Sequence, residues 1–244
     1  MAESRIEGMR VLVAGGGHRL GAALAIDLAA AGARVAISHR SSAEQAAGTA
    51  ARIAQLGGSG VVVQADVADP AQARAMVQRA AAELGGLDGY VHSPSGGFQP
   101  RSASQIDEQL WDAAMDSTAK GFLFAAQAAH AVMRETGGVI IAINDVAARQ
   151  PWSQFAHHCA AKAAQAQLIK CLALEFGGDG VRVAGIAPGP VLMPDGGTRG
   201  ESEETALGRH GEPADVAAAL RYLLTADFVT GTVVAVDGGR LLRP

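Results

Sequence analysis

The sequence predicts an α/β fold: a single domain built on a doubly wound parallel sheet of seven strands, with helices on both faces. Short apolar segments alternate with Ala-rich helical segments along all 244 residues, and this order is typical of a parallel sheet covered by helices. Several apolar segments are continuous β-branched runs, such as residues 61–63, which suit strands buried on both faces. No linker, repeat or low-complexity segment divides the chain, so we expect one domain over residues 1–244.

We expect six helical segments to separate the strands. Crossovers between parallel strands should be right-handed, and ligands should bind beyond the carboxyl ends of the strands. The expected strands span residues 11–14, 34–38, 60–64, 89–92, 139–143, 182–186 and 233–236.

Composition limits the classes of partner. The chain is 49% hydrophobic and 18% charged, which is typical of a globular protein. The net charge is −4 with the signs interspersed, so we expect no nucleic-acid partner. No apolar run reaches the roughly 18 residues of a membrane span, and the N-terminus lacks a secretory h-region, so no membrane association is expected. The two cysteines, Cys159 and Cys171, fit a reducing compartment, and we expect a cytoplasmic protein without a metal site.

The stretch V-L-V-A-G-G-G-H-R-L-G, residues 11–21, is the centre of the prediction. The first expected strand breaks into three glycines, from Gly15 to Gly17, and Leu20 and Gly21 then open a helix. Such a turn aims free backbone N–H groups and the positive end of the helix dipole at one point, which suits a pyrophosphate. The alternative is a turn that uses glycine for geometry alone. Its place at the first strand–helix junction favours a dinucleotide site.

The residues after the second and third strands indicate which dinucleotide binds. A site that prefers NAD usually has an acidic residue after the second strand, where it binds the ribose 2′-OH. This chain has His39, Arg40 and Ser41 there. Arg40 and Ser41 suit a 2′-phosphate, so we expect NADP(H) rather than NAD(H); the alternative is a solvated arginine beside a helix cap. Asp66 is expected to accept from the adenine amino group, and Asp69 to cap a helix.

Further segments complete a known pattern. They are residues 14–21, Asp66-Val67, Trp111-Asp112 with Lys120-Gly121, residues 139–143, Lys162, residues 181–183 with Pro188-Gly189, residues 209–217 and residues 236–239. Together they resemble the short-chain dehydrogenase/reductase family over essentially the whole chain. The resemblance implies a Rossmann-type NAD(P)-binding domain, and a homodimer or homotetramer formed through helices at 111–135 and 154–177.

Several departures from the family pattern resemble its pteridine-reductase branch. Arg19 stands where the family usually has a second glycine, and the resemblance implies that it helps to hold phosphate. His39-Arg40-Ser41 is similar to that branch, as is Ser95 at the end of the family's Asn-Asn-Ala-Gly motif. Phe98 lies near the position of a pterin-stacking aromatic residue. The predicted cofactor contacts are Gly15, Gly17, His18, Arg19, Leu20, Gly21, His39, Arg40, Ser41, Asp66, Val67, Ser93, Lys162, Pro188, Gly189 and Val191.

The family's catalytic Ser, Tyr and Lys positions read Asp145, His158 and Lys162, with the spacings of 13 and 4 residues kept. The resemblance implies that Lys162 holds the nicotinamide ribose. Positions four apart share a helix face. We expect Asp145 to accept from one ring nitrogen of His158, leaving the other nitrogen to exchange a proton with the substrate. His157 is the alternative histidine, and Thr118 replaces the family's helix Asn.

The leading hypothesis is an NADP(H)-dependent oxidoreductase that reduces a carbonyl or imine group of a small molecule. Because the catalytic Tyr is absent, two alternatives stay open: a nucleotide-binding sensor or partner module without redox chemistry, and a lyase or isomerase that uses Asp145 and His158. Phe98, Trp152 and Phe155 are expected either to line the substrate pocket or to pack internally. The segment 190–207 occupies the usual place of a substrate lid in the family.

Overall fold

A computed structural model describes residues 6–191 and 205–243. Within these residues, seven parallel strands form one sheet in the order β3-β2-β1-β4-β5-β6-β7, which confirms the predicted fold class. Each strand lies within two residues of its expected ends. The strands are β1 (Arg10–Ala14), β2 (Arg34–His39), β3 (Val61–Gln64), β4 (Gly89–His92), β5 (Gly138–Ile143), β6 (Val181–Pro188) and β7 (Val233–Val236).

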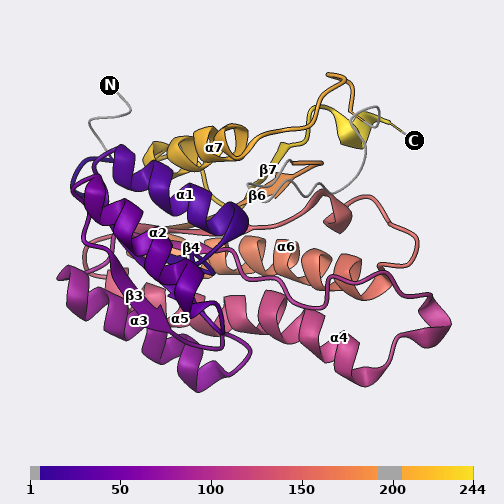
Figure 1. Ribbon diagram of the computed structural model, residues 1–244, viewed down its shortest axis with the longest axis horizontal. Helices are drawn as coiled ribbons and strands as arrows, with labels where there is room; N and C mark the ends of the chain where they lie inside the picture. Colours follow the sequence, from indigo (N-terminus) through magenta and orange to yellow (C-terminus); the bar gives the residue numbers. More distant parts are fainter. Residues whose placement is uncertain (1–5, 192–204, 244) are drawn as a thin grey trace.

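Two helical layers cover the sheet, and each layer packs on a separate apolar core (Figure 1). One layer contains α1 (Arg19–Ala30), α2 (Ala43–Gln55) and α7 (Pro213–Thr225); the other contains α3 (Pro70–Leu84), α5 (Gly121–Met133) and α6 (Ala156–Phe176). A shorter helix, α4 (Glu108–Met115), continues into α5 through a π-helical turn, Asp116–Lys120. Short 3-10 turns span Ala103–Gln105, Val146–Ala148, Gly177–Asp179 and Arg240–Leu242.

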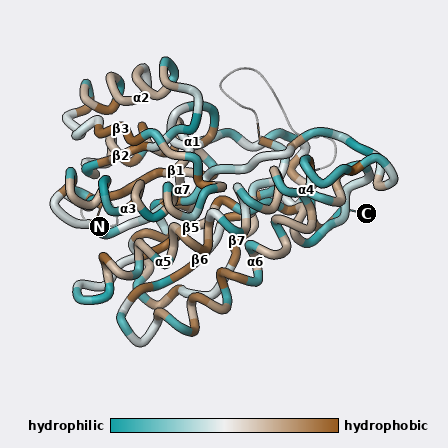
Figure 2. The backbone as a smooth tube through the Cα atoms, turned by 90° about the horizontal axis from the view of Figure 1, so that it is seen from below, coloured by the Kyte–Doolittle hydropathy of each residue, from teal (hydrophilic) through white to brown (hydrophobic). Residues whose placement is uncertain are grey.

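The central strands are buried along most of their length because both faces are covered. In β4 every residue is buried, whereas the edge strand β3 has one buried residue of four. Figure 2 shows largely brown strands between helices that alternate brown and teal. The start of α3 follows the predicted capping pattern: Asp69 Oδ1 accepts from the backbone N–H of Ala71 at 2.7 Å and of Gln72 at 3.3 Å.

The order of the strands sets the position of the site. The chain runs outward from β1 to β2 and β3, then crosses to β4 on the other side of β1 and continues to β7. At such a reversal, the loops after the two central strands diverge and leave a crevice at the carboxyl edge of the sheet. The glycine loop follows β1 directly, so it lies at this crevice.

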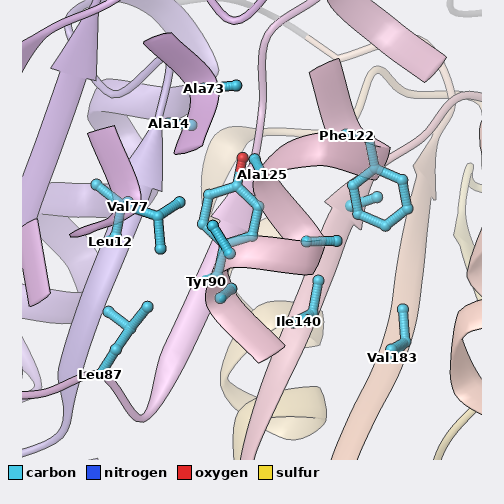
Figure 3. Close-up of a cluster of buried hydrophobic side chains, with 14 of the residues drawn as sticks. Leu12, Ala14, Ala73, Val77, Leu87, Tyr90, Phe122, Ala125, Ile140 and Val183 are labelled. Carbon is cyan, nitrogen blue, oxygen red and sulfur yellow. The ribbon is translucent and has the colours of Figure 1, made fainter. Parts of the chain in front are cut away.

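A buried polar pair interrupts the apolar core between the sheet and α5. The Tyr90 hydroxyl lies 2.7 Å from His92 Nδ1, and His92 Nε2 lies 3.1 Å from the carbonyl oxygen of Ser117. Figure 3 shows Tyr90 among the apolar side chains of this core. Because the Ser117 carbonyl only accepts, Nε2 carries the imidazole proton and Nδ1 accepts from the Tyr90 hydroxyl. Burial lowers the pKa of His92 to about 3 and raises that of Tyr90 above its usual range.

This pair predicts a loss of stability in acid. An unfolded histidine binds a proton below about pH 6.5, whereas His92 stays neutral in the folded protein down to about pH 3. The unfolded state therefore binds more protons between these values, and stability falls as the pH falls. At about pH 5 the contribution of His92 is a loss of about 2 kcal/mol.

Urea unfolding of the wild type and His92→Asn at about pH 7 and pH 5 measures this contribution. The variant should be less stable than the wild type at both pH values. Its free energy of unfolding should fall by about 2 kcal/mol less than that of the wild type between about pH 7 and pH 5. His18→Gln, at an exposed position, should lose as much stability as the wild type. Equal losses in the wild type and His92→Asn would show that His92 does not cause the acid sensitivity.

Candidate active site

The glycine loop after β1 forms one wall of a cavity of about 510 Å³ at the carboxyl edge of the sheet. Gly15 has a φ of +72°, in the left-handed region that favours glycine. Its backbone N–H donates to Ser38 Oγ at 3.3 Å, which ties the loop to the end of β2. A Cβ on Gly21 would lie only 2.2 Å from the Gly15 carbonyl oxygen. The loop and the first turn of α1 therefore approach each other as closely as glycine permits.

Every residue predicted to contact the cofactor lines this cavity, and so does Asp145. They come from the carboxyl ends of six strands, β1 to β6, with the loops that follow, and from α1 and α6. The sheet topology brings these distant segments together. Lining residues that the sequence prediction did not include are Ser38, Ser42, Gln45, Ala65, Pro94, Ser95, Gly96, Ser117, Ile143 and Asn144. Most of them directly flank a predicted contact, and this adjacency in the sequence could have identified them as lining residues.

Arg19 lies in the cavity wall with a φ of +54°. This left-handed conformation costs a non-glycine residue about 1 kcal/mol or more, and it explains physically why a glycine is usual at this place. The only other described non-glycine residue with positive φ is Gln154, at +67°. An arginine held in this conformation indicates that its side chain, rather than its backbone, is the reason for its presence.

The cavity wall fits a nicotinamide dinucleotide. The glycine loop offers backbone N–H groups, and a Cβ on Gly17 would lie 3.1 Å from Ser42 Oγ, so the glycine keeps this part of the wall open. His39 Nδ1 and Ser95 Oγ are buried polar atoms without a hydrogen-bond partner among residues 6–191 and 205–243. Buried polar atoms are normally hydrogen-bonded, so these two suit polar groups of a ligand. His39 ends β2 and Arg40 and Ser41 follow it, at the place where a 2′-phosphate is expected.

Asp145 and His158 approach each other across the catalytic segment. Asp145 Oδ2 lies 3.3 Å from His158 Nε2, and Oδ1 accepts from the Ala147 backbone N–H at 3.0 Å. The carboxylate thus caps the 3-10 turn that follows β5 and also contacts the imidazole. Lys162, one turn further along α6, is buried and donates from Nζ to the Ile143 carbonyl oxygen at 2.8 Å. The predicted trio therefore lies together beside the end of β5.

The aromatic residues surround His158. Phe98 stacks on Phe155 with ring centroids 4.8 Å apart and meets the His158 ring edge-on at 4.9 Å. Trp152 lies nearly parallel to the His158 ring at 6.1 Å. The structure brings the three predicted substrate residues together, but none of them is among the described residues that line the large cavity. His158 is fully buried and is not among them either.

His157 points to a different place from His158. Its Nε2 lies 2.7 Å from the Gly97 carbonyl oxygen, which holds the loop that carries Phe98 against α6. A buried network behind Lys162 was not predicted: Asn144 Nδ2 donates to the Lys162 carbonyl at 2.9 Å, and Gln165 Nε2 donates to the Thr118 carbonyl at 3.1 Å. Thr118 lies in the π-helical turn, so this network joins α6 to that turn.

Part of the predicted substrate lid, residues 192–204, lies outside the described residues. Cys159 and Cys171 are both free thiols on α6. None of the helices in the described segments combines the length and apolarity required to cross a membrane.

Comparisons with known proteins agree with this geometry. A sequence model of the family described as enoyl-(acyl carrier protein) reductase matches residues 16–240. This match, with the fold, shows that the chain belongs to the short-chain dehydrogenase/reductase family, and it is an oxidoreductase of that family. A 3β-hydroxysteroid dehydrogenase of Eggerthella lenta is 35% identical over 254 residues, which cover 98% of this chain and 96% of the relative.

Solved structures show the same likeness. A short-chain dehydrogenase of Burkholderia cenocepacia in complex with NADP has a TM-score of 0.91 and 33% identity, covering 97% of this chain and 99% of the other. A 7α-hydroxysteroid dehydrogenase in complex with NADH and 7-oxo glycochenodeoxycholic acid has a TM-score of 0.90 and 28% identity, covering 98% and 96%. Nicotinamide dinucleotides of both kinds therefore bind to structural neighbours of this chain.

Proposed function

We propose that this chain is an NADP(H)-dependent reductase that transfers hydride to a carbonyl or imine group of a small molecule, nearest to the pteridine-reductase branch of its family. The observation that carries the proposal is one continuous cavity with two chemically different ends. Arg19, Arg40 and Ser41 lie at the end that suits a 2′-phosphate. Asp145 and Lys162 lie at the end where hydride transfer takes place in this family.

The roles of the chain's own residues follow from their positions. A bound dihydronicotinamide supplies the hydride. The glycine loop binds the pyrophosphate through backbone N–H groups, Lys162 orients the nicotinamide ribose, and the Asp145–His158 pair supplies the proton that the substrate needs. The assembly we propose is a homodimer or homotetramer.

The aromatic cluster supports an apolar, flat substrate. Phe98, Trp152 and Phe155 form a contiguous set of rings next to His158, outside the described lining of the cavity. A planar ligand that extends past Asp145 would meet these rings, and aromatic rings favour stacking. Relatives include proteins named as a 3β-hydroxysteroid dehydrogenase, a versicolorin reductase of Aspergillus parasiticus and a probable tetrahydroxynaphthalene reductase of Zymoseptoria tritici. These names refer to fused-ring compounds, so ketones on fused rings and pterins are the first substrates to screen.

Titration with NADPH and NADH, followed by ligand fluorescence, tests the cofactor. We expect selective NADPH binding in the wild type. Arg19→Gly should weaken NADPH binding by about tenfold through loss of a charge-assisted phosphate contact. The same change should raise the free energy of unfolding by about 1 kcal/mol, because it removes the left-handed arginine.

Gln154→Gly is the matched control, since it relieves a similar φ of +67° away from the described cavity wall. It should raise stability without changing NADPH affinity. Unchanged NADPH affinity in Arg19→Gly would show that Arg19 does not contact the phosphate. If the wild type bound neither NADPH nor NADH, the reductase proposal would be refuted.

A nucleotide-binding protein without redox chemistry is the second candidate. The complete burial of His158, at the position of the family's catalytic Tyr, favours it. Sustained NADPH oxidation with any carbonyl or imine substrate would exclude this candidate.

A further inference from the structure

The Asp145–His158 pair has a definite orientation relative to the cavity. Asp145 lines the cavity, whereas His158 is absent from its described lining. The side chain of Asp145 is 8% exposed and that of His158 is 1% exposed. The carboxylate is therefore the member of the pair that faces the ligand space, and the imidazole lies behind it.

The imidazole's outer nitrogen is directed at Asp145. Nε2 is the ring nitrogen farther from the backbone of α6, and it lies 3.3 Å from Asp145 Oδ2. Nδ1 is one bond closer to the helix and is buried. A ring that directs its outer nitrogen at the carboxylate keeps its inner nitrogen beside its own helix. The arrangement expected from sequence, with the second nitrogen facing the substrate, is not the one that the structure shows.

Two aromatic rings hold His158 in this place. Phe98 meets the imidazole edge-on at 4.9 Å, and Trp152 lies at 6.1 Å with an interplanar angle of 20°. Asp145 is held separately by the Ala147 N–H, which donates to Oδ1 at 3.0 Å. Packing therefore fixes the imidazole and a backbone hydrogen bond fixes the carboxylate, each independently of a ligand.

We propose that Asp145 is the catalytic residue that exchanges a proton with the substrate, and that His158 is a positioning residue that supplies Asp145 with that proton. The inference rests on the proposed reductase function. It reverses the order expected from sequence: the substrate contacts Asp145, and Asp145 contacts His158.

The proton and electron balance is simple in the reductive direction. The hydride from the bound cofactor forms a C–H bond at the carbonyl carbon, and the π electrons of the C=O bond move to oxygen. That oxygen takes a proton from the Asp145 carboxyl group. Before the step the pair holds one proton, shared between Asp145 Oδ2 and His158 Nε2. After the step the pair is a carboxylate and a neutral imidazole, and one proton from solvent restores it. Each turnover consumes one hydride and one solvent proton.

Asp145→Asn and His158→Gln separate the two roles. Asparagine keeps an acceptor for the Ala147 N–H but carries no exchangeable carboxyl proton. Single-turnover NADPH oxidation with a substrate of the wild type should slow by about 1000-fold in Asp145→Asn, with NADPH affinity unchanged. In His158→Gln it should slow by about tenfold, and the rate should rise as the pH falls, because the carboxyl group then takes its proton directly from solvent.

His130→Gln is the control, since His130 lies on α5 and contacts Asp179 rather than Asp145. Its pH profile should match that of the wild type. The other buried ionisable groups near the pair on α6, His157 and Lys162, are unchanged in both test variants. A readout without turnover is the NMR titration of imidazole nitrogens in cofactor-free protein. The signal that His158→Gln removes should shift in Asp145→Asn.

Two results would overturn the inference. The first is near-wild-type turnover in Asp145→Asn. The second is a loss of turnover rate in His158→Gln that equals the loss in Asp145→Asn and leaves the pH profile unchanged, and this result would make His158 the proton donor. A wild type that binds NADPH but reduces no substrate refutes the reductase function and this inference together. That outcome is distinct from both variant results, because it appears before any substitution is made.

Discussion

Replacing Gly21 by alanine is expected to abolish tight nucleotide binding. Gly21 lies in the first turn of α1, and the added Cβ would lie 2.2 Å from the Gly15 carbonyl oxygen and 2.9 Å from its carbonyl carbon. Both atoms belong to the backbone, so the loop itself must move. Because we propose that the loop binds the pyrophosphate through its backbone N–H groups, a shift of the loop should misalign all of these groups. We expect NADPH affinity to fall at least about 100-fold, or about 3 kcal/mol.

Gly48→Ala provides the matched control for Gly21→Ala. Gly48 is also a helical glycine, in α2, and a Cβ there would meet no atom within 4 Å. Alanine at an open helical position stabilises by up to about 1 kcal/mol, so Gly48→Ala should raise Tm by about 2–4 °C with NADPH affinity unchanged. Thermal unfolding and fluorescence titration measure both quantities. Wild-type affinity in a folded Gly21→Ala variant would contradict the role of the loop.

Replacing Lys162 by methionine is expected to have the second large effect. Lys162 is 2% exposed, lines the cavity and donates from Nζ to the Ile143 carbonyl at 2.8 Å. Methionine is similar in size but provides neither charge nor donor. Because the ammonium is proposed to orient the ribose, its loss should slow single-turnover hydride transfer by about 100-fold or more. NADPH affinity should fall by about tenfold.

Stability distinguishes this effect from misfolding. A buried ammonium loses much of its hydration, so an apolar replacement of similar volume should leave Tm close to the wild-type value. Lys170→Met, at an exposed position on the same helix α6, should leave Tm, affinity and rate unchanged. Hydride transfer at the wild-type rate in Lys162→Met would show that another group orients the cofactor.

The sequence predicted the fold well because its local signals agree with one another. Buried parallel strands favour continuous apolar runs, and such runs mark β1 and β5 directly. The glycine loop, the cation after β2 and the proline–glycine pair after β6 each stand next to a strand end. Since every parallel strand ends at the same edge of the sheet, these predictions also placed the residues around one cavity.

The catalytic pair was less predictable because its orientation depends on side-chain packing. The spacing of Asp145, His158 and Lys162 predicted proximity, and the structure brings the three together. The His158 ring presents Nε2 to Asp145, and it packs against Phe98, which comes from a loop 60 residues earlier in the chain. The sequence also did not predict the left-handed backbone of Arg19, since arginine has no intrinsic preference for positive φ.

The sequence by itself determined the α/β class, the strand positions and the place of the glycine loop, because these depend on hydrophobic periodicity and on glycine geometry, which are local properties. Only the tertiary structure decided that Asp145 faces the cavity, that His158 lies behind it among aromatic rings, and that Tyr90, His92 and Ser117 form a buried polar chain. These features depend on contacts between segments distant in sequence, where rotamers are selected by close packing rather than by their neighbours in the chain.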